Sequence, residues 1–359
     1  MTLPGPTPLL LPYQGVHPRL LGPVASAATG SAVLGRVTLG AHAQLGPMAV
    51  LRADGHVVEA GAHLFMGRHA TVHIAHDVYG TFIGAHVSVG ANAVVHACTL
   101  GDDCVVQDDA AILDGATIGA GCAIAAGSVV FPRTTLPPGH WCEGAPAVAV
   151  RPLGDDERQA LHAALRNAPA GARPGPTHRG AESAVTAGTP FVASTVTGLG
   201  ALRMAARSSL WFGCVVATEG EGLVLGERSN VQDNSVMLAL SRPIRIGADV
   251  TIGHNVLMHG CTVADRVLVG MASRIAEGTV IESDVLVAAG THTLPGQVLE
   301  GGGLWGGRPA RRLAALDDRK REVIGRSARI YCEYAEGFSQ ARIDAPGPPA
   351  MSPPETALR

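Results

Sequence analysis

The sequence predicts an all-β protein made of two tandem β-solenoid domains, each followed by an α-helix. Three observations predict this fold: a six-residue repeat of aliphatic and small residues, a second copy of the same pattern later in the chain, and a polar helical segment after each copy. The 359-residue chain holds 46 glycines and 4% aromatic residues. This departs from an average globular composition and suits a repeat that turns many tight corners.

The six-residue repeat is clearest at residues 99–128 (TLGDDCVVQDDAAILDGATIGAGCAIAAGS) and returns at residues 250–279. In both, an aliphatic or small residue recurs at a fixed phase and is followed by Gly, Ala or Asp. A period of six fits neither an amphipathic helix, which has about 3.6 residues per turn, nor an alternating strand. It fits a triangular solenoid in which each hexad is one flat side and three sides make a coil of about 18 residues.

The two copies end alike, with EGAPAVAVRPL in the first and GGRPARRLAAL in the second. An acidic residue pair then opens a helical segment, as is typical of a helix N-terminus, and we expect these helices to cover the ends of the solenoids. The predicted organisation is a first domain at residues 1–168, a Pro/Gly/Ala-rich linker at 169–188, a second domain at 189–340 and a disordered tail at 341–359.

The composition argues against several classes of partner. The net charge is −3 with acidic and basic residues interspersed, so we expect neither nucleic acid nor an anionic membrane as a partner. The chain has no uninterrupted apolar run of about 18 residues, as a membrane span would need. Its seven cysteines are an odd number without CxxC spacing, which indicates reduced thiols and a cytoplasmic protein.

The histidines point to a metal site. The phrase IGHNVLMHGC carries His254 and His259, and its earlier counterpart VGANAVVHAC has Ala91 and His96. Residues five positions apart on an extended side are up to about 16 Å apart, whereas ligand nitrogens each lie about 2.0–2.1 Å from one zinc ion, so His254 and His259 do not easily share an ion. His73 precedes His96 by 23 positions, about one coil plus a short loop. We expect these two to stack, and His254 to donate the third nitrogen.

These residues make the chain resemble the gamma-class carbonic anhydrase family of left-handed parallel β-helix, hexapeptide-repeat proteins, duplicated in tandem. The resemblance lies in LLPYQGVHPRL, VLRADG, NVQDN, the His-x4-His phrase and a closing GxPA turn before a helix. It covers nearly the whole chain except the linker and the tail. Hexads alone are shared with many acyltransferases, but this combination is specific.

The resemblance implies that domains pack in threes, with a metal ion at their interface. The ion is usually zinc, with iron or cobalt as alternatives. One domain supplies an early histidine and the second member of the His-x4-His pair, here His73 and His96, and its neighbour supplies the first member, here His254. The first copy has Ala91 and the second has Leu238 in the remaining positions. One complete site is therefore expected where the two copies meet.

Four more site residues follow from the resemblance and divide between the copies in the same way. Arg52 and Asp54 occur in the first copy only, and Gln232 and Asp233 in the second only. In the family the Gln lies near the bound water and the Arg bridges the acidic residues across the interface. An alternative is that Arg52, Asp54 and Asp233 form only an interface ion-pair network.

The resemblance implies a carbonic anhydrase, a carbon–oxygen lyase that interconverts carbon dioxide and bicarbonate, or a related reaction of another small molecule. Three neutral imidazoles leave a metal ion its full charge and an open position for water. His76, three residues after His73, is a candidate for the proton shuttle. The alternatives are a hexapeptide-repeat acyltransferase that uses acyl-CoA and a non-catalytic assembly subunit braced by a metal. For a carbonic anhydrase we expect a homo-oligomer built on threefold domain packing.

Overall fold

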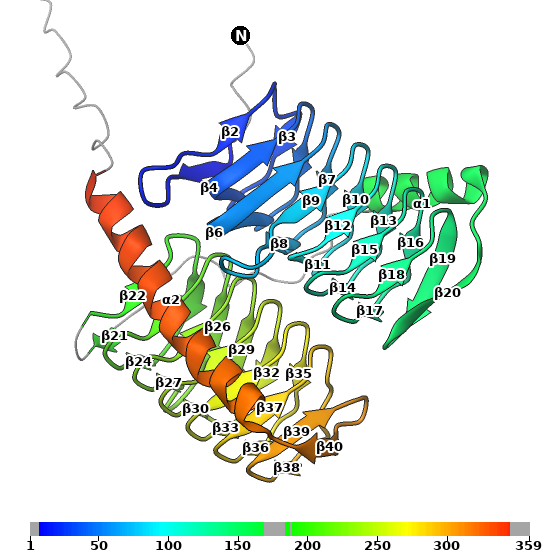
Figure 1. Cartoon of the computed structure of the whole chain (residues 1–359). Helices are drawn as coiled ribbons and strands as arrows, with labels where there is room; N and C mark the ends of the chain where they lie inside the picture. Colours follow the sequence, from blue (N-terminus) through cyan, green and yellow to red (C-terminus); the bar gives the residue numbers. More distant parts are fainter. Residues whose placement is uncertain (1–6, 169–183, 187–188, 345–359) are drawn as a thin grey trace, which may run out of the picture.

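The protein forms two parallel β-solenoids that lie side by side, with one long helix running along them (Figure 1). The computed structural model describes residues 7–168, 184–186 and 189–344. We call residues 7–168 the first half and residues 184–344 the second half. Neither of the two described helices has the length and apolar character that a membrane span needs.

The first half has two sheets, and one of them folds around a corner of the prism because the long strands β4 and β6 each belong to two faces. The 12-stranded sheet contains β1 (Leu9–Leu11), β2 (Arg19–Leu20), β4 (Ala32–Leu39), β6 (Val50–Ala60), β8 (Thr71–His73), β9 (Thr81–Ile83), β11 (Val94–His96), β12 (Thr99–Leu100), β14 (Ala111–Ile112), β15 (Thr117–Ile118), β17 (Val129–Val130) and β18 (Thr135–Leu136). The 8-stranded sheet contains β3 (Ser26–Ala27), β5 (Gln44–Leu45), β7 (Phe65–Met66), β10 (Ser88–Val89), β13 (Val105–Val106), β16 (Ala123–Ile124), β19 (His140–Gly144) and β20 (Ala147–Pro152).

The second half has three sheets, one for each face of its prism. The first contains β21 (Ala184–Thr186), β24 (Leu202–Met204), β27 (Leu223–Leu225), β30 (Ile244–Ile246), β33 (Thr262–Val263), β36 (Val280–Ile281) and β38 (Val298–Leu299). The second contains β22 (Phe191–Val192), β25 (Ser209–Leu210), β28 (Asn230–Val231), β31 (Thr251–Ile252), β34 (Val267–Val269), β37 (Val285–Val287), β39 (Gly303–Gly306) and β40 (Arg311–Ala315). The third contains β23 (Thr197–Leu199), β26 (Val215–Thr218), β29 (Val236–Ala239), β32 (Leu257–His259) and β35 (Arg274–Ile275).

The predicted period of six is confirmed by the backbone at the corners. Corner residues adopt left-handed dihedral angles at regular intervals of the sequence, and Gly, Asp and Asn tolerate this conformation best. In the most regular part of the first half the left-handed residues are Asp103, Asp109, Gly115, Gly121, Gly127, Arg133 and Gly139. Between them, parallel strands of only two residues stack from coil to coil, as the hexad pattern requires of a left-handed β-helix.

Each prism has its own apolar interior. The inward residues of successive coils, such as Val95, Ile112 and Val130, are fully buried and form one continuous cluster in the first half. A second continuous cluster runs from Leu202 to Trp305 in the second half. Each fully buried aliphatic side chain of this kind contributes roughly 1.5–3 kcal/mol, so the two interiors hold the coils in register.

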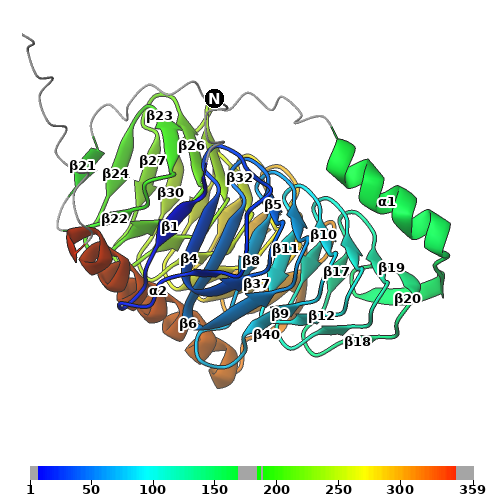
Figure 2. The same cartoon turned by 90° about the horizontal axis from the view of Figure 1, so that it is seen from above.

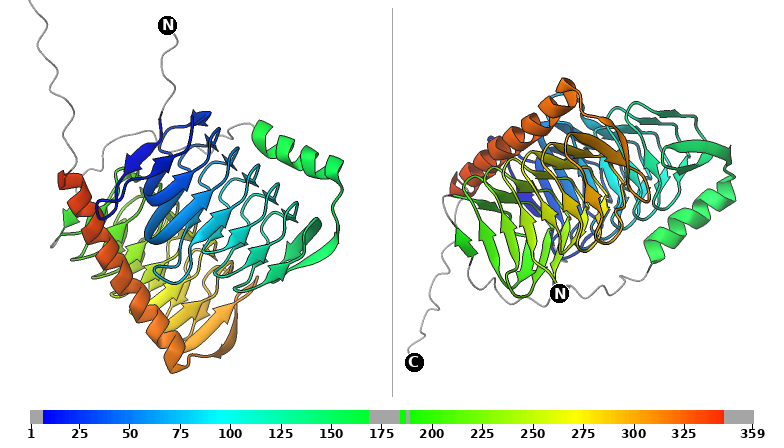
Figure 3. Two further views of the ribbon diagram at one scale, coloured as in Figure 1. Left: turned by 45° about the horizontal axis from the view of Figure 1, so that its top comes forward. Right: turned by 90° about the horizontal axis from the view of Figure 1, so that it is seen from below.

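The two helices lie along the sides of the prisms, and the expectation that they cover the ends is wrong. Helix α1 (Asp155–Asn167) contacts β10 and β13, and α2 (Asp318–Asp344) contacts β22, β25 and β31. They lie on different sides of the molecule, with α2 beside both halves (Figures 2 and 3). The last coil of each half is instead followed by an antiparallel strand, β20 in the first half and β40 in the second, which pairs with the strand at the sheet edge.

The domain boundaries differ from the predicted ones at two places. Strand β21 lies inside the predicted linker at 169–188 and pairs in parallel with β24, which adds one more strand to that sheet. Residues 169–183 and 187–188 of that linker lie outside the described residues. Helix α2 continues to Asp344, past the predicted end at 340, and the remaining predicted tail, 345–359, also lies outside the described part.

Two apolar patches join the halves. One is aromatic and brings Tyr13 of the first half together with Trp211, Phe212 and Phe338 of the second. The other is aliphatic and packs buried first-half residues such as Val94, Ala111, Leu113 and Val129 against Met271, Ala272 and Ala289. The predicted site residues also lie at this boundary, where Arg52 of the first half meets Asp233 of the second.

Candidate metal centre

His73 and His96 end neighbouring strands of the first half. Strand β8 pairs with β11 in parallel, and His73 is the direct partner of His96 in that register. Their side chains approach on the outer face, with His73 Nδ1 3.2 Å from His96 Nε2. The predicted stacking of the two histidines on successive coils is therefore confirmed.

His254 reaches the same point from the second half. It lies in the turn after β31, and its Nε2 atom is 3.2 Å from His73 Nδ1. The three ligand atoms lie within 4.8 Å of one another, all three residues are buried, and no other group of three such residues occurs among the residues described. His259 pairs with Leu238 of the preceding coil and is not part of this group.

Each imidazole turns its other ring nitrogen toward a carboxylate. This arrangement fixes which nitrogen carries the proton, as is usual for histidines that bind metals. The contact of His254 is within ion-pair range but is not a hydrogen bond. The three contacts are His73 Nε2 to Asp54 Oδ2 at 2.9 Å, His96 Nδ1 to Asp114 Oδ1 at 2.6 Å, and His254 Nδ1 to Asp233 Oδ2 at 3.1 Å.

The donor set fits a divalent ion. Burial, with the nearby positive charges, lowers the pKa of His73 well below its ordinary value, and burial lowers the pKa of His254 to about 4. Both rings are thus neutral near pH 7, as metal ligands must be. In a tetrahedral site with bonds of 2.0–2.1 Å the ligand nitrogens are roughly 3.3 Å apart, and the two contacts made by His73 Nδ1 are both 3.2 Å.

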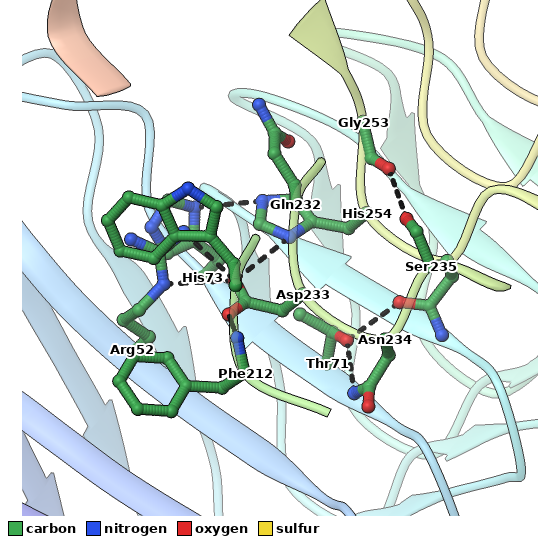
Figure 4. A network of polar contacts seen from close by, with 12 residues as sticks. Arg52, Thr71, His73, Phe212, Gln232, Asp233, Asn234, Ser235, Gly253 and His254 are labelled. Carbon is green, nitrogen blue, oxygen red and sulfur yellow. Dashed lines mark hydrogen bonds and ion pairs between the residues drawn. The ribbon is translucent and has the colours of Figure 1, made fainter. Parts of the chain in front are cut away.

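Arg52 connects the carboxylates of the two halves, and Figure 4 shows its contact with Asp233. Its guanidinium donates hydrogen bonds to Asp54 of its own half and to Asp233 Oδ2 of the other half, the latter at 2.9 Å from Nε. It also donates to the Tyr331 hydroxyl at 3.0 Å and lies 4.3 Å from the ring centre of Trp211. All of these groups are buried, so each charge of the network depends on its partners rather than on water.

The pKa values of the two aspartates in this network shift in opposite directions. Burial raises the pKa of Asp54 to about 7, against the opposing effect of Arg52. Burial acts the same way on Asp233, but Arg52 and His254 outweigh it and hold the Asp233 pKa below its ordinary value. For Arg52 burial favours the neutral form, yet Asp233 and Asp54 together keep its pKa above the ordinary value. The geometry places Arg52, Asp54 and Asp233 in the bridging arrangement expected from the sequence.

A cavity of about 300 Å³ opens in front of the histidines. Gln232, which is 6% exposed, lines it together with His73 and His96, and its amide nitrogen donates to Asn230 Oδ1 at 3.3 Å. The rest of the wall is mainly apolar, with Val78, Leu268, Met271, Val323 and Ile330 among its residues. The cavity therefore offers a largely apolar space beside the imidazoles of His73 and His96 and the amide of Gln232.

Two asparagines align the halves next to the histidines. Asn234 Nδ2 donates to Thr71 Oγ1 at 2.9 Å, and Thr71 Oγ1 donates to Asn255 Oδ1 at 2.7 Å. Asn255 Nδ2 also donates to the backbone carbonyl oxygen of His69 at 2.7 Å. Both asparagines occupy left-handed corners, so the turn that shapes the solenoid also presents an amide to the other half.

The sequence analysis missed Asp114 and the tyrosines of α2. Asp114 lies 18 positions after His96, so counting one 18-residue coil onward from His96 would have found it. Tyr331 and Tyr334 reach the site because α2 crosses the boundary between the halves. The Tyr334 hydroxyl and His76 Nδ1 form a hydrogen bond of 2.7 Å. Nothing in the local sequence indicates where the helix lies.

Known proteins resemble this chain at the level of repeats and of whole domains. The hexapeptide-repeat families match it: "Bacterial transferase hexapeptide (six repeats)" at residues 97–132, and "Hexapeptide repeat of succinyl-transferase" at 80–107 and 243–271. A protein of Geobacillus kaustophilus named "Carbonic anhydrase" is 32% identical over 160 residues, which cover 44% of this chain and 88% of that protein. The chain belongs to the gamma-class carbonic anhydrase family of hexapeptide-repeat proteins.

Other relatives match about as much of the chain, close to the length of one half. "Gamma carbonic anhydrase 1, mitochondrial" of Arabidopsis thaliana is 37% identical over 42% of this chain, and the match spans only 57% of the plant protein. "Protein YrdA" of Escherichia coli is 32% identical over 39% of this chain and 80% of its own length. A solved structure titled as a hexapeptide transferase family protein from Anaplasma phagocytophilum is 31% identical, with a TM-score of 0.36, and covers 42% of this chain and 92% of its own.

Proposed function

We propose that this chain is a metal-dependent carbonic anhydrase that interconverts carbon dioxide and bicarbonate at one site shared by its two halves. His73, His96 and His254 are the proposed ligands, and zinc is the proposed ion, with iron or cobalt as alternatives. The observation that carries the proposal is the convergence of three buried imidazole nitrogens, each ring backed by a carboxylate. Relatives named carbonic anhydrase support it.

The ion supplies Lewis-acid activation of a water molecule near neutral pH when it is bound. The residues of the chain do the rest. The apolar wall of the cavity accepts carbon dioxide, which carries no charge. This wall offers few competing hydrogen-bonding groups. Gln232 orients the substrate or the attacking water through its side-chain amide. Arg52 holds Asp54 and Asp233 in place, and through them the rings of His73 and His254.

The proton released in the hydration direction has a path along the cavity wall. His76 lines the same cavity as His73 and His96, and its side chain is 29% exposed. Its Nδ1 atom contacts the Tyr334 hydroxyl at 2.7 Å, and its Nε2 atom lies 3.9 Å from Asp77 at the surface. We assign His76 as the group that accepts the proton inside and releases it to solvent.

Two other functions are separated from this one by a single set of measurements. A hexapeptide-repeat acyltransferase would transfer an acyl group from acyl-CoA without the metal, and a metal-braced assembly subunit would bind the metal without catalysis. Stopped-flow hydration of carbon dioxide by the zinc-loaded protein, repeated after chelation, is expected to show activity that depends on zinc. Zinc binding without hydration would favour the assembly subunit, and acyl transfer that persists after chelation would favour the acyltransferase.

The assembly and the location of the protein are part of the same proposal. We propose a homo-oligomer based on threefold packing of the solenoid domains, which static light scattering tests directly. All seven cysteines are free and buried, which supports the predicted cytoplasmic location. Fractionation of cells tests the location, because some relatives carry the word mitochondrial in their names.

A further inference from the structure

Asp114 occupies a corner of the first half directly above His96. It follows β14 by two residues, and its Oδ1 atom is 2.6 Å from His96 Nδ1. The coils on both sides fix this corner. The Arg133 amide of the next coil donates to the Asp114 carbonyl oxygen at 2.9 Å, and the Gly115 amide donates to the carbonyl oxygen of Ala97 in the preceding coil at 2.7 Å. The carboxylate is therefore presented to the ring by a rigid turn.

Asp114 differs from the other two carboxylates that face the histidines. Asp54 and Asp233 are fully buried and share the positive charge of Arg52. The side chain of Asp114 is 41% exposed, and among the residues described it forms an ion pair with no arginine or lysine, only the contact with His96. It is also the closest of the three carboxylates to its histidine. Its hydrogen bond and its only ion-pair contact among the residues described are thus directed at a single imidazole.

The two tautomers of His96 have opposite consequences for the site. With the proton on Nδ1, the ring donates to Asp114 and leaves the Nε2 lone pair toward His73 and His254. With the proton on Nε2, a hydrogen would point into the space between the three rings and block a ligand bond. Asp114 as a carboxylate accepts but does not donate, so it favours the first tautomer.

We propose that Asp114 is a positioning residue that fixes the ring orientation and tautomer of His96 and so prepares its Nε2 atom to bind the ion. The inference rests on the proposed metal site and adds a residue to it. Outer groups of this kind typically change metal affinity by about tenfold to a hundredfold when they are replaced. Asp114 acts only through His96 and contacts neither the substrate nor the ion.

The tautomer is tested first in the metal-free protein. Proton–nitrogen correlation of ¹⁵N-histidine-labelled protein, with His96 assigned through His96→Gln, is expected to show a protonated Nδ1 and an unprotonated Nε2. In Asp114→Ala the two nitrogens of His96 are expected to shift toward a mixture of tautomers, while the signals of His254 stay in place. An unchanged His96 pattern in Asp114→Ala would overturn the proposal, whatever the metal affinity.

The metal affinity gives the second test. Zinc competition with a chelator is expected to show a dissociation constant about tenfold to a hundredfold higher for Asp114→Asn, largely restored in Asp114→Glu. Asp102→Asn is the matched control, since Asp102 is an exposed corner residue whose Oδ1 accepts from the Ala85 amide, and it should bind zinc as the unchanged protein does.

The outcomes separate this inference from the proposed function. Equal zinc affinity and equal cobalt absorption spectra for Asp114→Asn and the unchanged protein would contradict the role of Asp114. If the unchanged protein binds zinc but hydrates no carbon dioxide, the proposed function is wrong and the role of Asp114 is still decided by the two measurements above. If it binds no zinc, the metal site is wrong and the ring-nitrogen spectra alone decide whether Asp114 sets the His96 tautomer.

Discussion

His73 Nδ1 lies 3.2 Å from His254 Nε2 although 181 positions separate the two residues in the sequence. The same separation recurs between Arg52 and Asp233, whose side chains meet at 2.9 Å. Both contacts join the first half to the second. Because neither half has all three histidines or the whole ion-pair network, the site exists only where the unlike halves meet.

Arg52→Met is expected to destabilise the protein strongly. The substitution leaves Asp54 and Asp233 buried without their cation, and such uncompensated charges typically cost about 3–5 kcal/mol. The free energy of unfolding in urea is the measurement. Arg245→Met removes an exposed arginine that pairs with Glu221 and should cost less than about 1 kcal/mol. Equal losses for the two variants would show that the buried network is not what holds this interface.

Gln232→Ala is expected to lower carbon dioxide hydration without loss of the ion. The side chain lines the cavity beside the histidines and is not one of the three proposed ligands, so removing one orienting amide should cost roughly 100-fold in kcat/KM. Stopped-flow kinetics and metal analysis of the same sample measure both effects. Gln107→Ala, which removes an amide that only caps the Ala126 backbone on the outer surface, is the matched control. A kcat/KM equal to that of the control would remove Gln232 from the mechanism.

His76→Ala is expected to lower kcat and leave kcat/KM nearly unchanged. The reason is that His76 transfers a proton after the chemical step, and a positioned proton acceptor contributes about 100-fold or more. Imidazole buffer in the assay should restore much of the rate, because it replaces the missing ring. A loss in kcat/KM of the same size as the loss in kcat, with no response to buffer, would assign His76 a structural role instead.

The metal-free protein is expected to lose stability in mild acid in part through His254. Its pKa is about 4 in the folded protein and near 6.5 when exposed, so the unfolded chain binds more protons between these values. Stability is therefore fully present above pH 6.5 and is lost as the pH falls toward 4, by about 3 kcal/mol for this group. In His254→Gln this component is absent, so from pH 7 to pH 4 the unfolding free energy of the unchanged protein should fall by about 3 kcal/mol more than that of the variant. Parallel curves would contradict the assignment.

Much of the fold follows from the sequence because the solenoid is specified locally. Each hexad places an aliphatic residue inward and a small or polar residue at the corner, so a series such as Asp103, Asp109 and Gly115 already marks the coil. The partners His73 and His96 could be predicted because stacking one coil upon the next is a matter of counting residues. His254 was expected as the third ligand because it is the unpaired histidine of the other copy, and the resemblance to a family put the site at a domain interface. Counting within one half says nothing about how the halves meet.

The remaining parts of the site depend on how the halves pack, and no repeat specifies that. The sequence of helix α2 does not reveal whether the helix lies along a side or covers an end. The approach of Tyr331 to Arg52 at 3.0 Å could therefore not be anticipated. Asn234 and Asn255 are typical corner residues, and their hydrogen bonds to the first half appear only once the prisms lie together.

The metal content of the purified chain tests the central claim most directly. Zinc per chain, measured by mass spectrometry on the native protein, is expected to be no more than one, to fall nearly to zero in His254→Ala, and to persist in His259→Ala, because His259 lies outside the triad. Two ions per chain, or an ion retained by His254→Ala, would contradict a single site made jointly by the two halves.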